Sequence, residues 1–104
     1  MKNMSTPKIK VNLPVSILKE GNVFIAYSPA IEVSTVGETF EEAQQRFEEA
    51  ANIFFEEIIE NKTFEEALLE LGWQKEDKHL CPPIVVSNQT RPFSFEQTVP
   101  ASCA

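Results

Sequence analysis

The chain has 104 residues, of which 42% are hydrophobic and ten are aromatic, so it can bury the core of one small domain but not of two. Nine basic residues stand against sixteen acidic ones, and the net charge of −7 argues against direct binding to the phosphate backbone of a nucleic acid. The longest apolar runs, at 53–55 and 84–86, are far shorter than the roughly 20 residues of a membrane span. Residues 1–10 lack the apolar stretch of a secretory signal, so we expect a cytoplasmic protein.

Three strands are predicted before any helix. Residues 8–18 alternate apolar with mostly polar side chains, which is typical of a strand with one buried face. The apolar positions are Ile9, Val11, Leu13, Val15 and Ile17. Pro14 has no amide hydrogen to donate, so this strand should have a free edge or a bulge there. A turn at 19–22 leads to a second strand at 23–27, and a third is expected at 31–36.

A long helix should follow over 40–60. Thr39 and Glu42 have the spacing of a capping box, in which each side chain binds a backbone amide of the first turn. Apolar residues then recur at steps of three and four, which places them on one helical face. They are Phe40, Ala43, Phe47, Ala50, Ala51, Phe54 and Ile58. Most of the glutamates lie on the opposite face.

A short helix should begin after a second capping box, formed by Thr63 and Glu66, and end at Gly72. We expect Trp73 to fold back on this helix. The apolar residues of the short helix again share one face. They are Phe64, Ala67, Leu68 and Leu71.

The remaining chain is polar and rich in proline, and residues 74–92 are predicted to be irregular. Residues 84–87 and 93–99 have strand-like patterns, and either could complete the sheet. The sequence therefore predicts a single α+β domain over 8–99, with a three-stranded antiparallel sheet, a long and a short helix and a possible fourth strand, in the order β-β-β-α-α-β. Residues 1–7 are expected to be a flexible N-terminus and 100–104 a disordered tail.

The charge is distributed unevenly. Residues 38–70 contain eleven glutamates but only two basic residues, a distribution that attracts basic proteins or simply keeps a helix soluble. The predicted partner-binding residues are Glu41, Glu48, Glu49, Glu56 and Glu57. Three further apolar residues widen the stripe of the long helix, and they could meet the second helix or form an oligomer interface. These residues are Ile53, Phe55 and Ile59.

Residues suited to catalysis are scarce. His79 is the single histidine, and Cys81 and Cys103 lack the spacing of a metal site or a CxxC motif, so both cysteines are read as ordinary thiols. Most glutamates come as adjacent pairs on a helix surface, whereas functional carboxylates converge from several elements. The three glycines stand apart, which excludes a glycine-rich phosphate loop. We expect no catalytic residue, metal or cofactor.

Two short motifs carry a family resemblance. Residues 24–29 read Phe-Ile-Ala-Tyr-Ser-Pro, and residues 37–43 read Gly-Glu-Thr-Phe-Glu-Glu-Ala, with Glu49-Ala50 following. In this order, within residues 11–60, they resemble the HicB family of antitoxins. The resemblance implies a reduced ribonuclease H-like fold without nuclease carboxylates, and indeed residues 8–18 contain no acid. It also implies a small basic RNA-cleaving HicA-like toxin as the partner.

Two segments depart from the family. Residues 30–34 replace its Leu-Pro-Gly-Cys-like stretch, and residues 74–104 are too rich in proline and too weakly basic for the DNA-binding domain that many members carry. We therefore expect a stand-alone member that does not bind DNA directly and forms a homodimer or higher oligomer. The alternative is an orphan self-associating scaffold or regulatory domain with an unrelated protein partner. A third class, a hydrolase, would need a site that the sequence does not reveal, and loss of activity in His79→Ala would support it.

Overall fold

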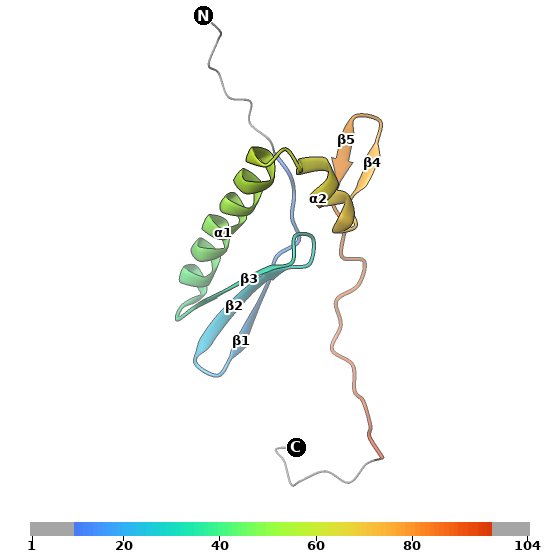
Figure 1. Cartoon of the computed structure of the whole chain (residues 1–104). Helices are drawn as coiled ribbons and strands as arrows, with labels where there is room; N and C mark the ends of the chain where they lie inside the picture. Colours follow the sequence, from blue (N-terminus) through green and yellow to red (C-terminus); the bar gives the residue numbers. More distant parts are fainter. Residues whose placement is uncertain (1–9, 97–104) are drawn as a thin grey trace, which may run out of the picture.

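The computed structural model describes residues 10–96. Its first half is a three-stranded antiparallel sheet of β1 (Ser16–Glu20), β2 (Val23–Ser28) and β3 (Val33–Gly37), with β2 in the centre (Figure 1). The predicted α+β class and the order of three strands, a long helix and a short helix are confirmed. The predictions for 1–7 and 100–104 lie outside the described residues.

The first strand is shorter than predicted and is shifted along the chain. Its pairing runs from Ser16 opposite Tyr27 to Glu20 opposite Val23, so only Gly21 and Asn22 form the turn. Residues 10–15 were expected to belong to this strand, but β2 ends at Ser28 and no strand of the described sheet lies opposite them. An alternating pattern creates the tendency to form a strand, whereas hydrogen bonding also requires a neighbour.

The third strand also begins later than predicted, at Val33. Residues 29–32 form a turn in which the Glu32 amide donates to the Ser28 carbonyl at 2.9 Å. Glu32 has a φ of 56°, which is incompatible with an extended strand. The turn therefore ends β2 and delays the start of β3.

Helix α1 (Phe40–Glu60) has the predicted bounds and packs across one face of the sheet, mainly on β3 and β2 (Figure 1). The Thr39 hydroxyl accepts a hydrogen bond from the Glu42 amide at 3.0 Å, as predicted. The Glu42 carboxylate accepts from the amide of Glu38, 2.6 Å away. Arg46 fastens the same end to the sheet by donating to the Val36 carbonyl at 2.8 Å.

Helix α2 (Phe64–Glu70) lacks the predicted second capping box, because the Thr63 side chain makes no cap hydrogen bond. Thr63 already closes α1. Its amide donates to the Ile58 carbonyl at 2.9 Å, and its hydroxyl points to the same carbonyl at 3.4 Å. At the other end, Gly72 and Trp73 donate to Leu69 and Leu68, which is the Schellman pattern expected from a terminal glycine.

The two threonines allow a matched test of capping. Thr39→Ala should lower the free energy of unfolding by about 1 kcal/mol, because the Glu42 amide loses its partner. Thr63→Ala should lower it by less than about 0.5 kcal/mol, since the only side-chain hydrogen bond lost is the long one to the Ile58 carbonyl, at 3.4 Å. Urea unfolding followed by circular dichroism measures both values. Equal losses would show that the Thr39 cap does not stabilise α1.

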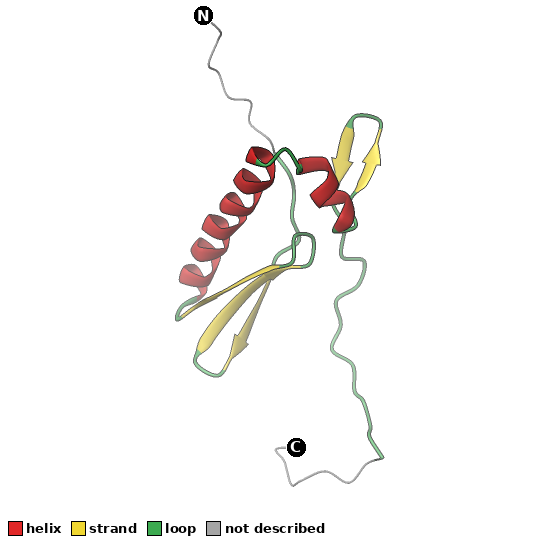
Figure 2. Ribbon diagram, in the orientation of Figure 1, coloured by secondary structure: helices red, strands yellow, loops and turns green. Residues whose placement is uncertain are grey.

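A second hairpin lies in a region predicted to be irregular. Strands β4 (Gln74–Glu76) and β5 (His79–Cys81) pair antiparallel as a separate two-stranded sheet (Figure 2). Neither 84–87 nor the described part of 93–99 forms a strand, and residues 97–99 lie outside the described part. The fourth strand of the main sheet is therefore not formed by either predicted segment within residues 10–96.

The core lies between the sheet and α1 and extends under α2. The buried apolar residues are Ala26, Ala30, Ile31, Ala43, Phe47, Ala51, Ile58, Leu68 and Trp73. Trp73 joins two parts of this core, because its indole nitrogen donates to the Ala30 carbonyl at 2.8 Å. The turn after β2 is thereby fixed to the end of α2.

Candidate functional site

The five glutamates predicted to bind a partner all lie exposed on α1. Successive helical residues are rotated by about 100°, which spreads the five side chains over about half of the helix circumference. Glu49 and Glu56 point away from the buried face, while Glu48 and Glu57 lie toward its two sides. We call this surface the acidic face, and it consists of Glu41, Glu48, Glu49, Glu56 and Glu57.

No ion pair within residues 10–96 involves the acidic face. The two that form are Arg46 with Glu42 at 3.3 Å and Lys75 with Glu65 at 2.9 Å. The helix itself contains seven glutamates and one arginine. The acidic face therefore presents carboxylates of one sign to a partner, and none of them forms an ion pair inside the described domain.

The three predicted interface residues have different environments. Phe55 packs within its own chain, with its ring 5.2 Å from Phe54 and 6.5 Å from Trp73, both edge to face. Ile53 and Ile59 instead are exposed, by 59% and 46%. Of the three, these two isoleucines are exposed, whereas Phe55 is half-buried.

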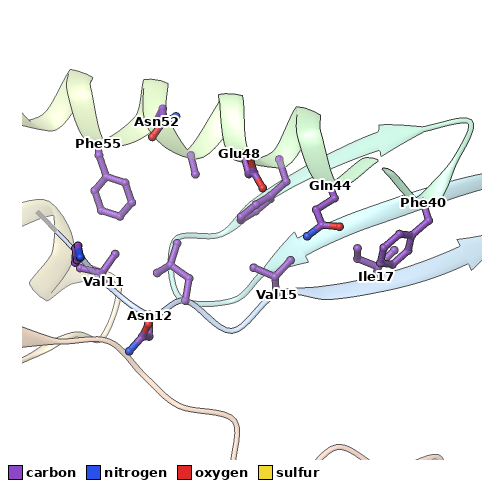
Figure 3. Close-up of a pocket in the computed structure, with 13 residues that line it drawn as sticks. Val11, Asn12, Val15, Ile17, Phe40, Gln44, Glu48, Asn52 and Phe55 are labelled. Atoms are coloured by element: carbon purple, nitrogen blue, oxygen red, sulfur yellow. The ribbon is translucent and has the colours of Figure 1, made fainter. Parts of the chain in front are cut away.

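A groove that sequence reasoning did not identify runs between α1 and the chain that leads into β1 (Figure 3). It has a volume of about 920 Å³. Its apolar lining consists of Val11, Leu13, Val15, Ile17, Phe40, Phe47, Ala51 and Phe55, and its polar lining of Lys10, Asn12, Gln44, Glu48 and Asn52.

The groove exists because α1 lies over β3 and β2 and contacts β1 least. The side of the helix that faces β1 is therefore only partly covered. Val15 and Phe40 on its walls are 42% and 46% exposed. The sequence feature that indicates this groove is the alternating pattern of 8–18, which is longer than β2, the strand that pairs with it.

The opposite face of the sheet carries a second apolar group. Leu18, Ile25 and Val36 are directly opposite one another across the three strands. Leu18 and Val36 are 55% and 48% exposed, so α1 covers one face of the sheet only. The domain thus combines a charged helix with apolar surface beside and beneath it.

His79 is exposed at the start of β5, opposite Glu76 in the hairpin. Cys81 has a free thiol and is half-buried, and Cys103 lies outside the described residues. Across residues 10–96, no three or more histidine, cysteine, aspartate or glutamate side chains gather closely enough to hold a metal ion. No helix within the same range is long and apolar enough to cross a membrane.

Comparison with protein-family models, with curated proteins and with solved structures gave no match for this chain. The function is therefore inferred from the surfaces of the domain itself.

Proposed function

We propose that this chain is a non-enzymatic binding protein that neutralises a small basic RNA-cleaving toxin, as HicB-type antitoxins do. The observation that carries the proposal is the acidic face: five exposed glutamates on one helix, with no ion pair among the described residues. The proposed compartment is the cytoplasm, where such a toxin would meet its RNA.

The physical support is charge complementarity on a well-anchored helix. A net charge of −7, concentrated on α1, raises the encounter rate with a basic protein and repels nucleic acid. The helix is fixed at its start by the Thr39 cap and the contact of Arg46 with Val36. The carboxylates can therefore form ion pairs without first ordering the backbone that carries them.

The order of elements supports the same proposal. Three antiparallel strands followed by a long helix agree with the arrangement expected from the HicB resemblance. The motif at 24–29 forms most of β2 and its end, and the motif at 37–43 forms the close junction of β3 with α1. Both motifs thus lie at positions that determine the path of the chain.

The test compares two variants with matched charge. The first changes every glutamate of the acidic face to glutamine. The second changes five exposed glutamates outside α1 to glutamine, namely Glu20, Glu32, Glu66, Glu70 and Glu76. Each immobilised protein is incubated with native lysate, washed at rising salt, and the eluted proteins are identified by mass spectrometry.

The wild type and the second variant should retain the same small basic protein and release it as the salt concentration rises, because salt screens exposed charges. The first variant should retain at least about tenfold less, since several favourable charge contacts are lost together. Equal retention by all three proteins would exclude the acidic face as the binding surface.

A second candidate is a self-associating scaffold or regulatory domain with an unrelated protein partner. The exposed Ile53 and Ile59, and the apolar row of Leu18, Ile25 and Val36, favour it. Surfaces of this kind suit a homodimer or higher oligomer. Recovery of the chain alone in the capture experiment would favour this candidate over the antitoxin.

A further inference from the structure

The last described part of the chain exposes apolar side chains to an unusual degree. Residues 82–96, here called the arm, form neither helix nor strand and run past the sheet without joining it (Figure 1). Ile84 and Val86 are 78% and 89% exposed, and Phe93 and Phe95 are 83% and 82% exposed. Large apolar side chains gathered in this way are typical of a surface that another molecule covers.

The start of the domain has the complementary feature. Residues 10–15, here called the overhang, extend β1 beyond the end of β2. Val11 and Leu13 are half-buried and line the groove, while Asn12 between them is exposed. No hydrogen bond within residues 10–96 involves the backbone of the overhang. The overhang therefore has the side-chain alternation of a strand without a neighbouring strand.

We propose that the arm of a second copy of this chain docks along the overhang and inserts Phe93 and Phe95 into the groove. Residues two apart in a strand point to the same side, so both rings can enter together while Ser94 and Glu96 face outward. Addition of an extended segment to a strand with unpaired backbone groups is a common mode of peptide recognition.

The arm fits the groove in size and in charge. The groove volume of about 920 Å³ is within the range of sites that hold drug-sized molecules, which is ample for two phenyl rings. The arm contains one basic residue, Arg91, and one acidic residue, Glu96, so its net charge is zero. It can approach the groove, which Glu48 borders, without the repulsion that a second acidic helix would meet.

With a second copy as the occupant, the exposed arm and the open groove of both chains are covered at once. The arm of the same chain leaves the domain after β5 and lies outside the groove. Two copies related by a two-fold axis would each supply one arm and one groove, so the contact is made twice and the assembly closes. Of the acidic face only Glu48 borders the groove, so this dimer does not depend on the antitoxin proposal.

Sedimentation velocity of the full chain tests whether two copies associate through their arms and grooves. The wild type should sediment as a dimer. Phe93→Ser with Phe95→Ser should raise the dissociation constant at least about a hundredfold, since four buried rings per dimer are lost. Val15→Lys should also yield monomers, because a long charged side chain would cross the groove. Leu69→Ser, which removes a 43% exposed apolar residue outside the arm and the groove, should remain dimeric.

Mixing the two monomeric variants gives the sharpest readout. The arm variant keeps an intact groove and the Val15→Lys variant keeps an intact arm, so one arm–groove contact can still form between them. The mixture should therefore contain heterodimers. A monomeric wild type, a dimeric arm variant or a mixture that stays monomeric would each overturn the proposal. Circular dichroism melting confirms that both variants are folded.

Discussion

Replacing Trp73 by alanine should remove about 4 kcal/mol from the free energy of unfolding, which is around half of what a domain of this size possesses. Trp73 is 3% exposed and packs edge to face on Phe55. Its indole nitrogen also donates to the Ala30 carbonyl at 2.8 Å, 43 residues away in sequence. The substitution leaves a cavity and detaches α2 from the turn after β2. Thermal unfolding should shift down by about 20 °C.

Trp73→Phe separates packing from hydrogen bonding. It keeps an aromatic ring but leaves the carbonyl of the fully buried Ala30 without the indole donor, and should lower the free energy of unfolding by about 2 kcal/mol. Leu69→Ala is the control, because Leu69 lies on α2 next to the buried Leu68 but is itself 43% exposed, and its loss should be below about 1 kcal/mol. Equal losses for the three variants would mean that Trp73 does not join the two parts of the core.

Gly37→Ala should be nearly as destabilising, for a different reason. A Cβ at this position would lie 2.8 Å from the Cα of Ala43 and 2.9 Å from the carbonyl carbon of Glu42, and closer still to the Ala43 amide nitrogen. These are backbone atoms of α1, which cannot move aside as a flexible side chain can. We expect the helix to shift away from β3, with a loss of about 3 kcal/mol in urea unfolding.

Gly21→Ala is the matched control for this close approach. Gly21 has a φ of 61° in the turn between β1 and β2, but a Cβ there would meet no atom within 4 Å. Its substitution should therefore cost only the backbone strain, about 1 kcal/mol. If Gly37→Ala were no worse than Gly21→Ala, the junction of β3 and α1 would be less rigid than the structure indicates.

The sequence predicts the long helix better than the strands, because helix signals come from residues close together in the chain, whereas a strand also depends on a distant partner. The bounds of α1 follow from Thr39 and from apolar spacing, both of which act within a few residues. Strand β1 depends on the position of its neighbour, and the two-residue turn at Gly21 and Asn22 sets a register that no local pattern specifies. The alternating pattern of the overhang therefore predicts a longer strand than β2 can pair.

Two other differences have equally specific causes. Thr63 has the residue type of an N-cap, but its amide and hydroxyl are directed to the Ile58 carbonyl at the end of α1. The β4–β5 hairpin has strands of only three residues, and β4 is exposed throughout, so no burial pattern marks it. Asp77 in its turn has a φ of 56°, a conformation that aspartate adopts more readily than most residues.

The candidate site could be predicted in part. The charge of the acidic face and the exposure of Ile53 and Ile59 follow from helical spacing, because one buried face determines the others. The intramolecular packing of Phe55 on Trp73 and the presence of the groove depend on how α1 crosses the sheet. That crossing is a property of tertiary packing, which spacing along one helix does not specify.

The most direct test of the central proposal measures RNA cleavage by the basic protein that the acidic face retains. The captured protein is purified, incubated with RNA, and titrated with the wild-type chain or with the variant whose acidic face carries glutamine. The proposal predicts that the captured protein cleaves RNA, that the wild type stops cleavage near equimolar amounts, and that the variant requires at least about tenfold more. A captured protein that does not cleave RNA, or cleavage that the wild type leaves unchanged, would contradict the proposal.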